Sequence, residues 1–277
     1  GVAAFGSYEE ALADPAVRVA LILTPPASHL ELAALALEAG KEVIVEKPPF
    51  LRSSDFDTIQ ELCARTGRRL FVAENYFYKP LASTLRLLLA DDVIGEPHFF
   101  EVNALKLQRT GDWRDDVELA GGGALFEGGI HWINLLASLG PRVTRARGVR
   151  VGQGPGPERG MHVQLEFEGG AAGTLLYSWE VPSPLKGLRL SRIYGREGSI
   201  SFESNGLWIG VWGRRKRFLL PGLRDIAGYR SMFADFFRAI RTGAEARMTL
   251  ARARRDLELV EEAYRSAGVG WAEETTR

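Results

Sequence analysis

The sequence has almost no cysteine and no excess of charge of either sign. Cys63 is the single cysteine among 277 residues, so an internal disulfide is excluded and a reducing, cytoplasmic location is expected. Lys plus Arg and Asp plus Glu number 35 each, which gives no bulk-charge signal for nucleic acid or an anionic membrane. We therefore expect neither nucleic acid nor a membrane as a partner.

Long apolar runs and metal-binding patterns are also missing. No stretch approaches the roughly 20 apolar residues of a membrane-spanning helix, and no signal peptide is recognisable. His98, His131 and His162 are scattered, without HxxxH or CxxC spacing, so no metal site is expected. A serine nucleophile elbow and a basic-aromatic pattern typical of single-strand binding are absent as well.

The first part of the chain alternates apolar strands with amphipathic helices. The segments VRVALILT, KEVIVEK and RRLFVAEN are predicted strands, and helices of 10 to 15 residues lie between them. Ser7 and Glu10 have the spacing of a capping box, and Gly40 and Gly67 end the two longer helices. This alternation predicts βαβ units and a parallel sheet.

The second part of the chain has a different period. Eight short segments between residues 97 and 221 alternate polar and apolar residues, with hairpin-type turns between several of them. Two helices, over residues 229–243 and 249–268, close the chain. We predict an α/β protein: a partial Rossmann parallel sheet in residues 1–78, then an α+β domain with a large open, mostly antiparallel sheet in residues 79–277. The C-terminal helices are expected to pack back onto the fold.

The first predicted strand ends in the sequence TPPASH. Thr24 offers a hydroxyl at the edge where open α/β sheets bind ligands, and Pro25 and Pro26 form a stiff wall there. A tight turn with Ser28 as helix N-cap is the competing interpretation, and His29 by itself is more typical of a histidine beside a cap than of a ligand contact.

The next two strands end in Glu46-Lys47-Pro48 and in Asn75-Tyr76. A lysine at this edge can polarise a substrate oxygen, and an asparagine can bind a cofactor amide or ribose. An ion pair at the sheet edge and simple turn chemistry are the alternatives. Because the ends of parallel strands share one edge, we expect all these residues to line one cleft.

A glycine-rich segment, GGGALFEGGIHWINLL, carries the best candidate for acid/base chemistry. Gly121–Gly123 permit close approach of backbone or ligand. Glu127 and His131 are four residues apart and would share one helix face, so we expect Glu127 to orient His131 or to bind a substrate hydroxyl. A purely structural histidine is the alternative. Trp113 and Arg114 can reach the same cleft; otherwise Trp113 only packs.

The motifs TPPASH, AGKEVIVEKP, ENYFYKP, DWR and GGGALFEGGIHWINLL, in this order, resemble the Gfo/Idh/MocA family of oxidoreductases over nearly the whole chain. The resemblance implies a Rossmann domain followed by an α/β domain with an open sheet. It also implies NAD- or NADP-dependent oxidation or reduction of a sugar, a polyol or a related alcohol or ketone. A homodimer or homotetramer formed through the open sheet is expected.

The resemblance also implies roles for particular residues. Lys47 matches the lysine beside the nicotinamide and the reacting oxygen, and His131 matches the acid/base histidine. Glu127, the third expected catalytic residue, and Asn134 stand where the family usually has aspartate, so a charge behind the histidine is expected to be missing. The expected cofactor contacts are Thr24, Pro25, Pro26, His29, Glu46, Lys47, Asn75, Trp113 and Arg114.

The front of the family pattern is not in the sequence. The first strand, the Gly-rich phosphate loop and the residue that selects NAD or NADP would take about 45 residues before Gly1, so we expect an N-terminally incomplete sequence. Three functions remain open: a dehydrogenase, a cofactor-recycling glycosidase or aldose–aldose oxidoreductase, and a non-catalytic sensor or scaffold. The dehydrogenase depends on Lys47 and His131 converging on one pocket.

Overall fold

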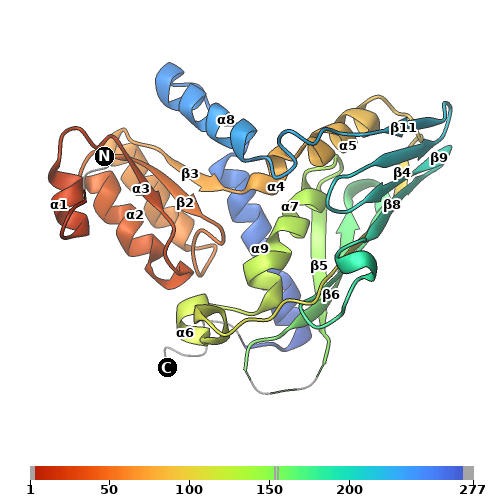
Figure 1. Ribbon diagram of the computed structural model, residues 1–277, viewed down its shortest axis with the longest axis horizontal. Helices are drawn as coiled ribbons and strands as arrows, with labels where there is room; N and C mark the ends of the chain where they lie inside the picture. The colour runs from red at the N-terminus through yellow and green to blue at the C-terminus, as the bar shows by residue number, and fades with distance from the viewer. Residues whose placement is uncertain (1–3, 153, 155, 271–277) are drawn as a thin grey trace.

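Two sheets organise the protein, whose structure is a computed structural model that describes residues 4–152, 154 and 156–270. A three-stranded sheet with its helices forms the first lobe, and an eight-stranded sheet forms the core of the second (Figure 1). The parallel first sheet and the mostly antiparallel second sheet confirm the predicted fold class. A domain boundary between residues 78 and 79 stays a prediction.

The first sheet consists of three parallel strands in the order β1-β2-β3. Val43, Ile44 and Val45 of the central strand β2 are all buried, so both faces of this strand are covered, whereas Leu21 of the edge strand β1 is 48% exposed. The side chain of Ser7 caps the first helix by accepting a hydrogen bond from Glu10 N. The elements are α1 (Tyr8–Ala13), β1 (Val19–Ile22), α2 (His29–Glu38), β2 (Glu42–Glu46), α3 (Asp55–Thr66) and β3 (Leu70–Ala73).

The second sheet has the order β11-β10-β9-β8-β4-β7-β6-β5. Within this sheet, β4 and β7 form the only parallel pair among the described strands. The strands are β4 (Pro97–Leu105), β5 (Val143–Arg150), β6 (Gly160–Phe167), β7 (Ala172–Ser178), β8 (Leu190–Gly195), β9 (Gly198–Glu203), β10 (Ile209–Trp212) and β11 (Arg217–Leu219).

The large sheet is buried on one face only. Met161, Val163 and Leu165 of β6 point into the core, whereas the alternate residues of this strand are half-buried or exposed. Helix α9 (Leu250–Ala267) lies so close to the buried face that a Cβ atom at Gly148 would come within 2.5 Å of the Ala263 carbonyl oxygen. The helices therefore cover one face of the large sheet, as the polar/apolar alternation of the sequence indicates.

The helices between and after the sheets place the site residues. The glycine-rich segment was predicted as one helix but forms a π-helix (Leu125–Gly129) that continues into α7 (Ile130–Ala137). The other elements are α4 (Asn75–Tyr78), α5 (Pro80–Ala90), a 3₁₀ turn (Trp113–Asp115), α6 (Val117–Ala120) and α8 (Tyr229–Thr242). None of the described helices is both long and apolar enough to cross a membrane.

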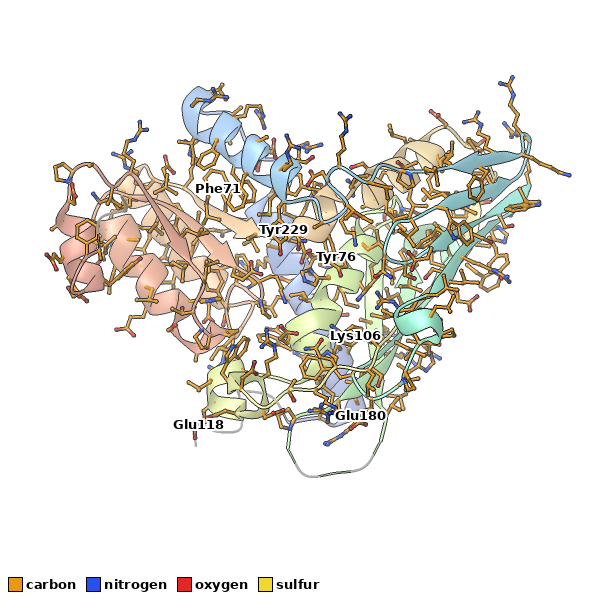
Figure 2. All side chains as sticks on the ribbon, viewed as in Figure 1. Phe71, Tyr76, Lys106, Glu118, Glu180 and Tyr229 are labelled. Atoms are coloured by element: carbon orange, nitrogen blue, oxygen red, sulfur yellow. The ribbon has the colours of Figure 1, made fainter. Side chains whose placement is uncertain are left out.

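Helix α8 follows the large sheet in sequence but packs against the first lobe. Its Phe236 ring stacks on Phe71 of β3, with 5.1 Å between the ring centres, and Figure 2 shows Phe71 beside this helix. The Arg69 guanidinium, next to β3, donates a hydrogen bond of 2.6 Å to the Ala239 carbonyl oxygen. The chain therefore returns to the first lobe and ties the two sheets together.

Candidate active site

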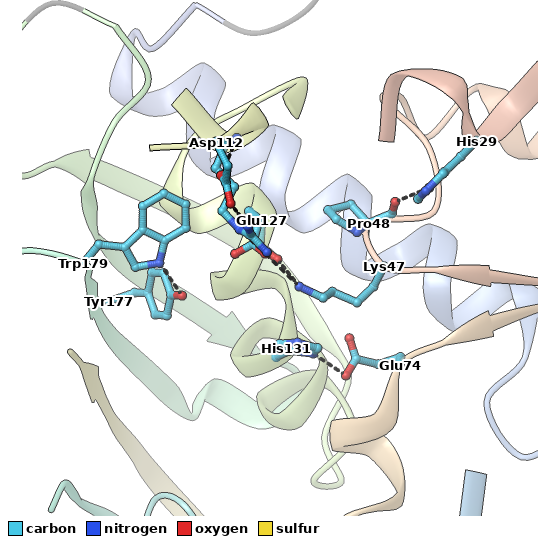
Figure 3. A network of polar contacts seen from close by, with 10 residues as sticks. His29, Lys47, Pro48, Glu74, Asp112, Glu127, His131, Tyr177 and Trp179 are labelled. Atoms are coloured by element: carbon cyan, nitrogen blue, oxygen red, sulfur yellow. Dashed lines mark hydrogen bonds and ion pairs between the residues drawn. The ribbon is translucent and has the colours of Figure 1, made fainter. Parts of the chain in front are cut away.

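Lys47 reaches from the first lobe into the second. It directly follows β2, and its Nζ donates a hydrogen bond of 2.7 Å to the Glu127 carbonyl oxygen and lies 3.4 Å from Glu127 Oε1 (Figure 3). The two side chains are only 11% and 10% exposed, so the ion pair is largely shielded from water. The strand end and the glycine-rich helix, 80 residues apart, meet at this point.

His131 is held by Glu74, which corrects the expectation that Glu127 orients it. His131 Nδ1 lies 2.6 Å from Glu74 Oε1 (Figure 3). Glu74 directly follows β3, is buried, and also accepts a hydrogen bond from Tyr76 N at the start of α4. Glu127 belongs to the π-helix and His131 to the α-helix after it, so the regular one-face geometry does not apply.

Burial decides the protonation of the Glu74–His131 pair. Burial and then the Lys47 charge hold the pKa of His131 well below its usual value, although Glu127 opposes them. Burial raises the pKa of Glu74 to about 7. The imidazole is therefore neutral, donates Nδ1–H to Glu74, and keeps Nε2 as an acceptor. No described residue binds Nε2.

Aromatic contacts fix the plane of the histidine ring. Tyr76 stacks on His131 with 4.1 Å between the ring centres and 10° between the planes, and Trp132 meets Tyr76 edge-on at 5.3 Å. With Glu74 at one nitrogen and Tyr76 on one face, the imidazole is restricted to one orientation.

Glu127 anchors two cations rather than the histidine. Arg114 Nε donates to Glu127 Oε1 over 3.2 Å, and Arg114 Nη1 pairs with Asp112 at 2.6 Å. Burial opposes ionisation of Glu127, but the charges of Lys47 and Arg114 outweigh it and hold its pKa below the usual value. Arg114 on this 3₁₀ turn therefore contacts Glu127, whereas a cofactor contact of Trp113 and Arg114 stays a prediction.

The turn after β1 is tied to the turn after β2 through His29. This imidazole is fully buried, with Nδ1 3.0 Å from the Pro48 carbonyl oxygen and Nε2 2.7 Å from that of Thr24. Both nitrogens are used within the protein, which corrects the expectation that His29 contacts the cofactor. Thr24 is exposed and its hydroxyl accepts a hydrogen bond from Ser28, whereas Pro25 is half-buried and Pro26 is buried; all three remain predicted cofactor contacts.

Glu46 and Asn75 complete the strand-end edge. Burial raises the pKa of Glu46 to about 7, against the nearby Lys47 charge. Asn75 Nδ2 donates a hydrogen bond of 2.7 Å to the Ala227 carbonyl oxygen, just before α8. The Asn75 amide nitrogen thus holds the returning chain, a role that is not visible in the local sequence because the two residues are 152 positions apart.

A carboxyl group from another helix lies beside Asn134, where the sequence lacks the expected aspartate. Asn134 Nδ2 donates a hydrogen bond of 2.7 Å to Asp256 of α9, and both side chains are buried. Burial raises the pKa of Asp256 well above its usual value and so opposes a charge at this position, although the hydrogen bond from Asn134 acts in the other direction. Sequence reasoning missed Asp256 because it lies 122 residues from Asn134.

The glycine-rich segment is glycine-rich because protein atoms approach it. A Cβ atom at Gly123 would lie 1.7 Å from Glu158 Oε2, and one at Gly128 would lie 2.1 Å from the Tyr177 hydroxyl. Glu158 is buried and accepts a hydrogen bond of 2.6 Å from Leu125 N at the start of the π-helix. Glu158 was also missed, and it supports the segment that carries Glu127 and His131.

The arrangement suits proton transfer and stabilisation of an oxygen anion. A neutral imidazole with a free nitrogen and a carboxyl behind it can take a proton, and an ammonium nearby can stabilise the oxygen left behind. No group of three His, Cys, Asp or Glu side chains in the described part of the chain could hold a metal ion.

Two family models match the chain. The model for the NAD-binding Rossmann fold of an oxidoreductase family matches residues 1–74, and the model for the GFO/IDH/MocA C-terminal domain matches residues 82–201. Together the two models cover most of the sequence.

Among known proteins, the trans-1,2-dihydrobenzene-1,2-diol dehydrogenases of pig and mouse are similar. The pig protein is 29% identical over 63% of this chain, and the match covers 52% of the pig protein. The mouse protein is 26% identical over 96% of this chain and 82% of its own length. The chain spans about half the length of the first three curated relatives that it matches.

Two solved structures are similar to this chain. GenD2 of gentamicin A biosynthesis, in complex with NAD, is 27% identical with a TM-score of 0.82, over 95% of this chain and 80% of GenD2. The aldose–aldose oxidoreductase of Caulobacter crescentus has the same fold, with a TM-score of 0.84 at 21% identity, over 94% of this chain and 80% of that one. The chain belongs to the Gfo/Idh/MocA family of oxidoreductases.

Proposed function

We propose that this protein is an NAD-dependent oxidoreductase that transfers a hydride between nicotinamide and a secondary alcohol or ketone of a sugar, polyol or related compound. The observation that carries the proposal is that Lys47 of the first lobe is bonded to Glu127, and Glu74 to His131, on the consecutive π-helix and α7, which brings these groups into one partly buried site (Figure 3). The Lys47 charge acts directly on His131, so the two groups can serve one substrate oxygen.

His131 and Glu74 would handle the proton of the alcohol. Nε2 of the neutral imidazole accepts the hydroxyl proton, and the Glu74 carboxylate stabilises the imidazolium that forms. In the reverse reaction His131 returns the proton to the oxygen. Stacking on Tyr76 keeps Nε2 aimed at the same point in both directions.

Lys47 would stabilise negative charge on the substrate oxygen during the reaction. Its ammonium is held by the Glu127 carbonyl oxygen at 2.7 Å and the Glu127 carboxylate at 3.4 Å. Two of its three N–H donors are thereby oriented, and the third remains for the substrate. Glu127 and Arg114 position Lys47 rather than react.

The residues at the strand-end edge fit the nicotinamide half of a dinucleotide. Thr24, Pro25, Pro26 and Glu46 border the edge next to Lys47, which is where open α/β sheets bind nucleotides. When bound, the cofactor supplies the acceptor of the substrate hydride. NAD is favoured because the family model that matches residues 1–74 describes an NAD-binding Rossmann fold, and because GenD2, at 27% identity, was solved with NAD.

The test is hydride transfer by the protein and by His131→Gln and Lys47→Met, followed as NADH absorbance with a panel of sugars and polyols. We expect the first change to lower kcat by roughly 10²- to 10⁴-fold, because the proton acceptor is lost. The second should lower kcat by roughly 10²-fold or more, because one donor to the developing oxyanion is lost.

Lys216→Met is the matched control for Lys47→Met, since Lys216 lies on the exposed turn between β10 and β11. It should react at the wild-type rate. Turnover by His131→Gln and Lys47→Met within a few-fold of wild type would disprove the mechanism. The absence of saturable NADH and NADPH binding would favour the scaffold instead.

A further inference from the structure

Five cationic side chains of the described residues lie around the His131–Glu74 pair. Only two of them form an ion pair with a carboxylate of the site. Lys47 and Arg114 are bound to Glu127. Lys79, Lys106 and Arg189 are the other three. Lys79 and Lys106 act electrostatically on His131, and Arg189 acts on both lysines and on Tyr76.

Lys79 lies directly behind the ring that stacks on His131. It follows α4, and its Nζ is 4.2 Å from the centre of the Tyr76 ring, whose other face contacts the imidazole. The Lys79 side chain makes no hydrogen bond or ion pair with a described residue. Lys79 is buried, at 7% exposure, but its nitrogen is not among the partnerless polar atoms that are completely sealed, so it keeps some contact with solvent.

Lys106 approaches the same place from the large sheet. It follows β4, is half-buried, and has its Nζ 5.8 Å from the centre of the Tyr177 ring. Its ammonium likewise has no hydrogen-bond or ion-pair partner among the described residues. Figure 2 places Tyr76 and Lys106 in the region between the first lobe and the large sheet.

Arg189 adds a buried charge behind the two lysines. Its guanidinium lies 5.4 Å from the centre of the Trp132 ring, its Nη2 donates to Asn205, and its Nε is buried without a partner. Glu203 is the nearest carboxylate, but its oxygens accept hydrogen bonds from backbone N–H groups and from Asn205. Arg189 therefore forms no ion pair with a described side chain.

These cations repel one another. Burial and then Arg189 lower the pKa of Lys79 to about 8. The pKa of Lys106 is lowered to about 8, chiefly by burial; Glu127 opposes this shift, and the charges of Lys47 and Arg189 add to it. The carboxyl groups that face the cluster are Glu46, Glu74, Glu127 and Glu203. Because two of these have pKa values near 7, cations outnumber anions at neutral pH.

We propose that the substrate carries an oxyanion, a carboxylate or a phosphate monoester, that binds between the ammonium groups of Lys79 and Lys106, beside the hydroxyl facing His131. The inference rests on the proposed function because it names the substrate class of the same site. A neutral sugar would leave both ammonium groups half-desolvated and unpaired, whereas an oxyanion would form charge-assisted hydrogen bonds with them.

The experiment is titration calorimetry of the whole chain at pH 7 with glucuronate, glucose 6-phosphate, inorganic phosphate and neutral glucose. We expect the anions to bind at least tenfold more tightly than glucose. Lys106→Met and Lys79→Met should each weaken anion binding about tenfold, the loss of one charge-assisted hydrogen bond, and leave glucose unchanged. The tighter of the carboxylate and phosphate arms identifies the group.

Affinity for the anions should fall as pH rises through about 8, where Lys79 and Lys106 lose their protons. Lys216→Met, on the exposed turn between β10 and β11, is the matched control and should bind like wild type. Thermal melts check that the variants are folded. Because Lys106 is only half-buried, we expect Lys106→Met to remain folded.

Three results would overturn the proposal: equal affinity for glucose and glucuronate, anion affinities within twofold of wild type in both lysine variants, or no anion binding up to concentrations on the order of 10 mM. Turnover of neutral polyols that is lost in His131→Gln would leave the proposed function standing and refute only the anion site. The two failures are therefore distinguishable.

Discussion

Glu74 decides the acid/base chemistry at the scale of single residues. It is 2% exposed, it sits one residue after a buried strand, and His131 is its partner at 2.6 Å. The same strand-end rule that identified Lys47 applies to Glu74. The sequence motif ENYFYKP drew attention to Asn75 instead, because an amide is a common ligand for a cofactor, whereas the carboxylate finds its partner 57 residues away.

Glu74→Gln should lower kcat roughly 10²-fold with little change in KM, because a neutral amide cannot stabilise the imidazolium. In the wild type, activity should also fall as pH drops below about 7, where the Glu74–His131 pair gains a proton. The variant should lose this acidic limb. Glu61→Gln, on an exposed face of α3, is the control, and an unchanged pH profile in Glu74→Gln would contradict the assignment.

Glu158 makes stability depend on pH. Burial raises its pKa to about 7, so the folded protein binds a proton that the unfolded chain releases near pH 4.5. The folded state therefore holds more protons between about pH 4.5 and 7, and stability falls as pH rises through this window. Glu158→Gln removes this loss.

Urea unfolding at pH 5 and pH 8 measures the effect of Glu158→Gln. The free energy of unfolding of the variant, taken relative to wild type, should be higher at pH 8 than at pH 5. The difference should be up to roughly 3 kcal/mol. Glu46, Glu74 and Asp256 also have raised pKa values. The stability of the Glu158→Gln variant should therefore still decline as pH rises, only less steeply than that of the wild type. An identical pH slope in the two proteins would refute the role of Glu158.

The π-helix is the element that sets the geometry of the site. It spans Leu125–Gly129, lies directly before α7, and turns Glu127 toward Lys47 and Arg114. Its start is supported by Glu158 and by the Tyr264 hydroxyl, which accepts hydrogen bonds from Gly123 N and Phe126 N. Segments far along the chain therefore hold this element in place.

Gly123→Ala should destabilise the protein by more than about 2 kcal/mol, because the added methyl group overlaps the carboxylate and backbone of Glu158. Gly154→Ala is the matched control: a Cβ atom there meets nothing within 4 Å, so we expect a change within about 0.5 kcal/mol. Chemical denaturation of both variants gives the comparison. Equal stabilities would show that the glycine-rich segment is less tightly packed than described.

The open face of the large sheet matters at the scale of the whole molecule. Phe99 of β4 is 58% exposed and lies in a groove across the sheet that His98, Glu101, Arg147, Thr174 and Tyr194 also line. An exposed apolar side chain in the middle of a sheet is typical of an interface between subunits. We propose that this face joins two copies of the chain.

Light scattering after gel filtration should therefore give at least twice the chain mass of 30.5 kDa, and Phe99→Asp should shift the protein toward the monomer. Leu87→Asp is the control, because Leu87 is 65% exposed on α5 and does not line this groove. A wild-type monomer, or an equal effect of both changes, would refute the interface.

Local patterns were sufficient to predict the elements of this protein. Helix caps at Ser7 and Gly67, apolar strands, and polar/apolar alternation depend on neighbours within a few residues, so they can be read from the sequence. The same patterns place Lys47 at a strand end. The π-helix was not predictable, because the protein atoms that exclude side chains at Gly123 and Gly128 come from Glu158 and Tyr177.

The sequence alone determined the order of strands and helices, and it singled out Lys47 and His131 as residues able to act on a substrate oxygen. Only the tertiary structure decided the partners of these residues: Glu74 for His131, Glu127 for Lys47 and Asp256 for Asn134. The reason is physical. Secondary structure follows from hydrogen bonds and side-chain periodicity along the chain, whereas the charge of a buried group depends on whichever distant segments the fold packs against it.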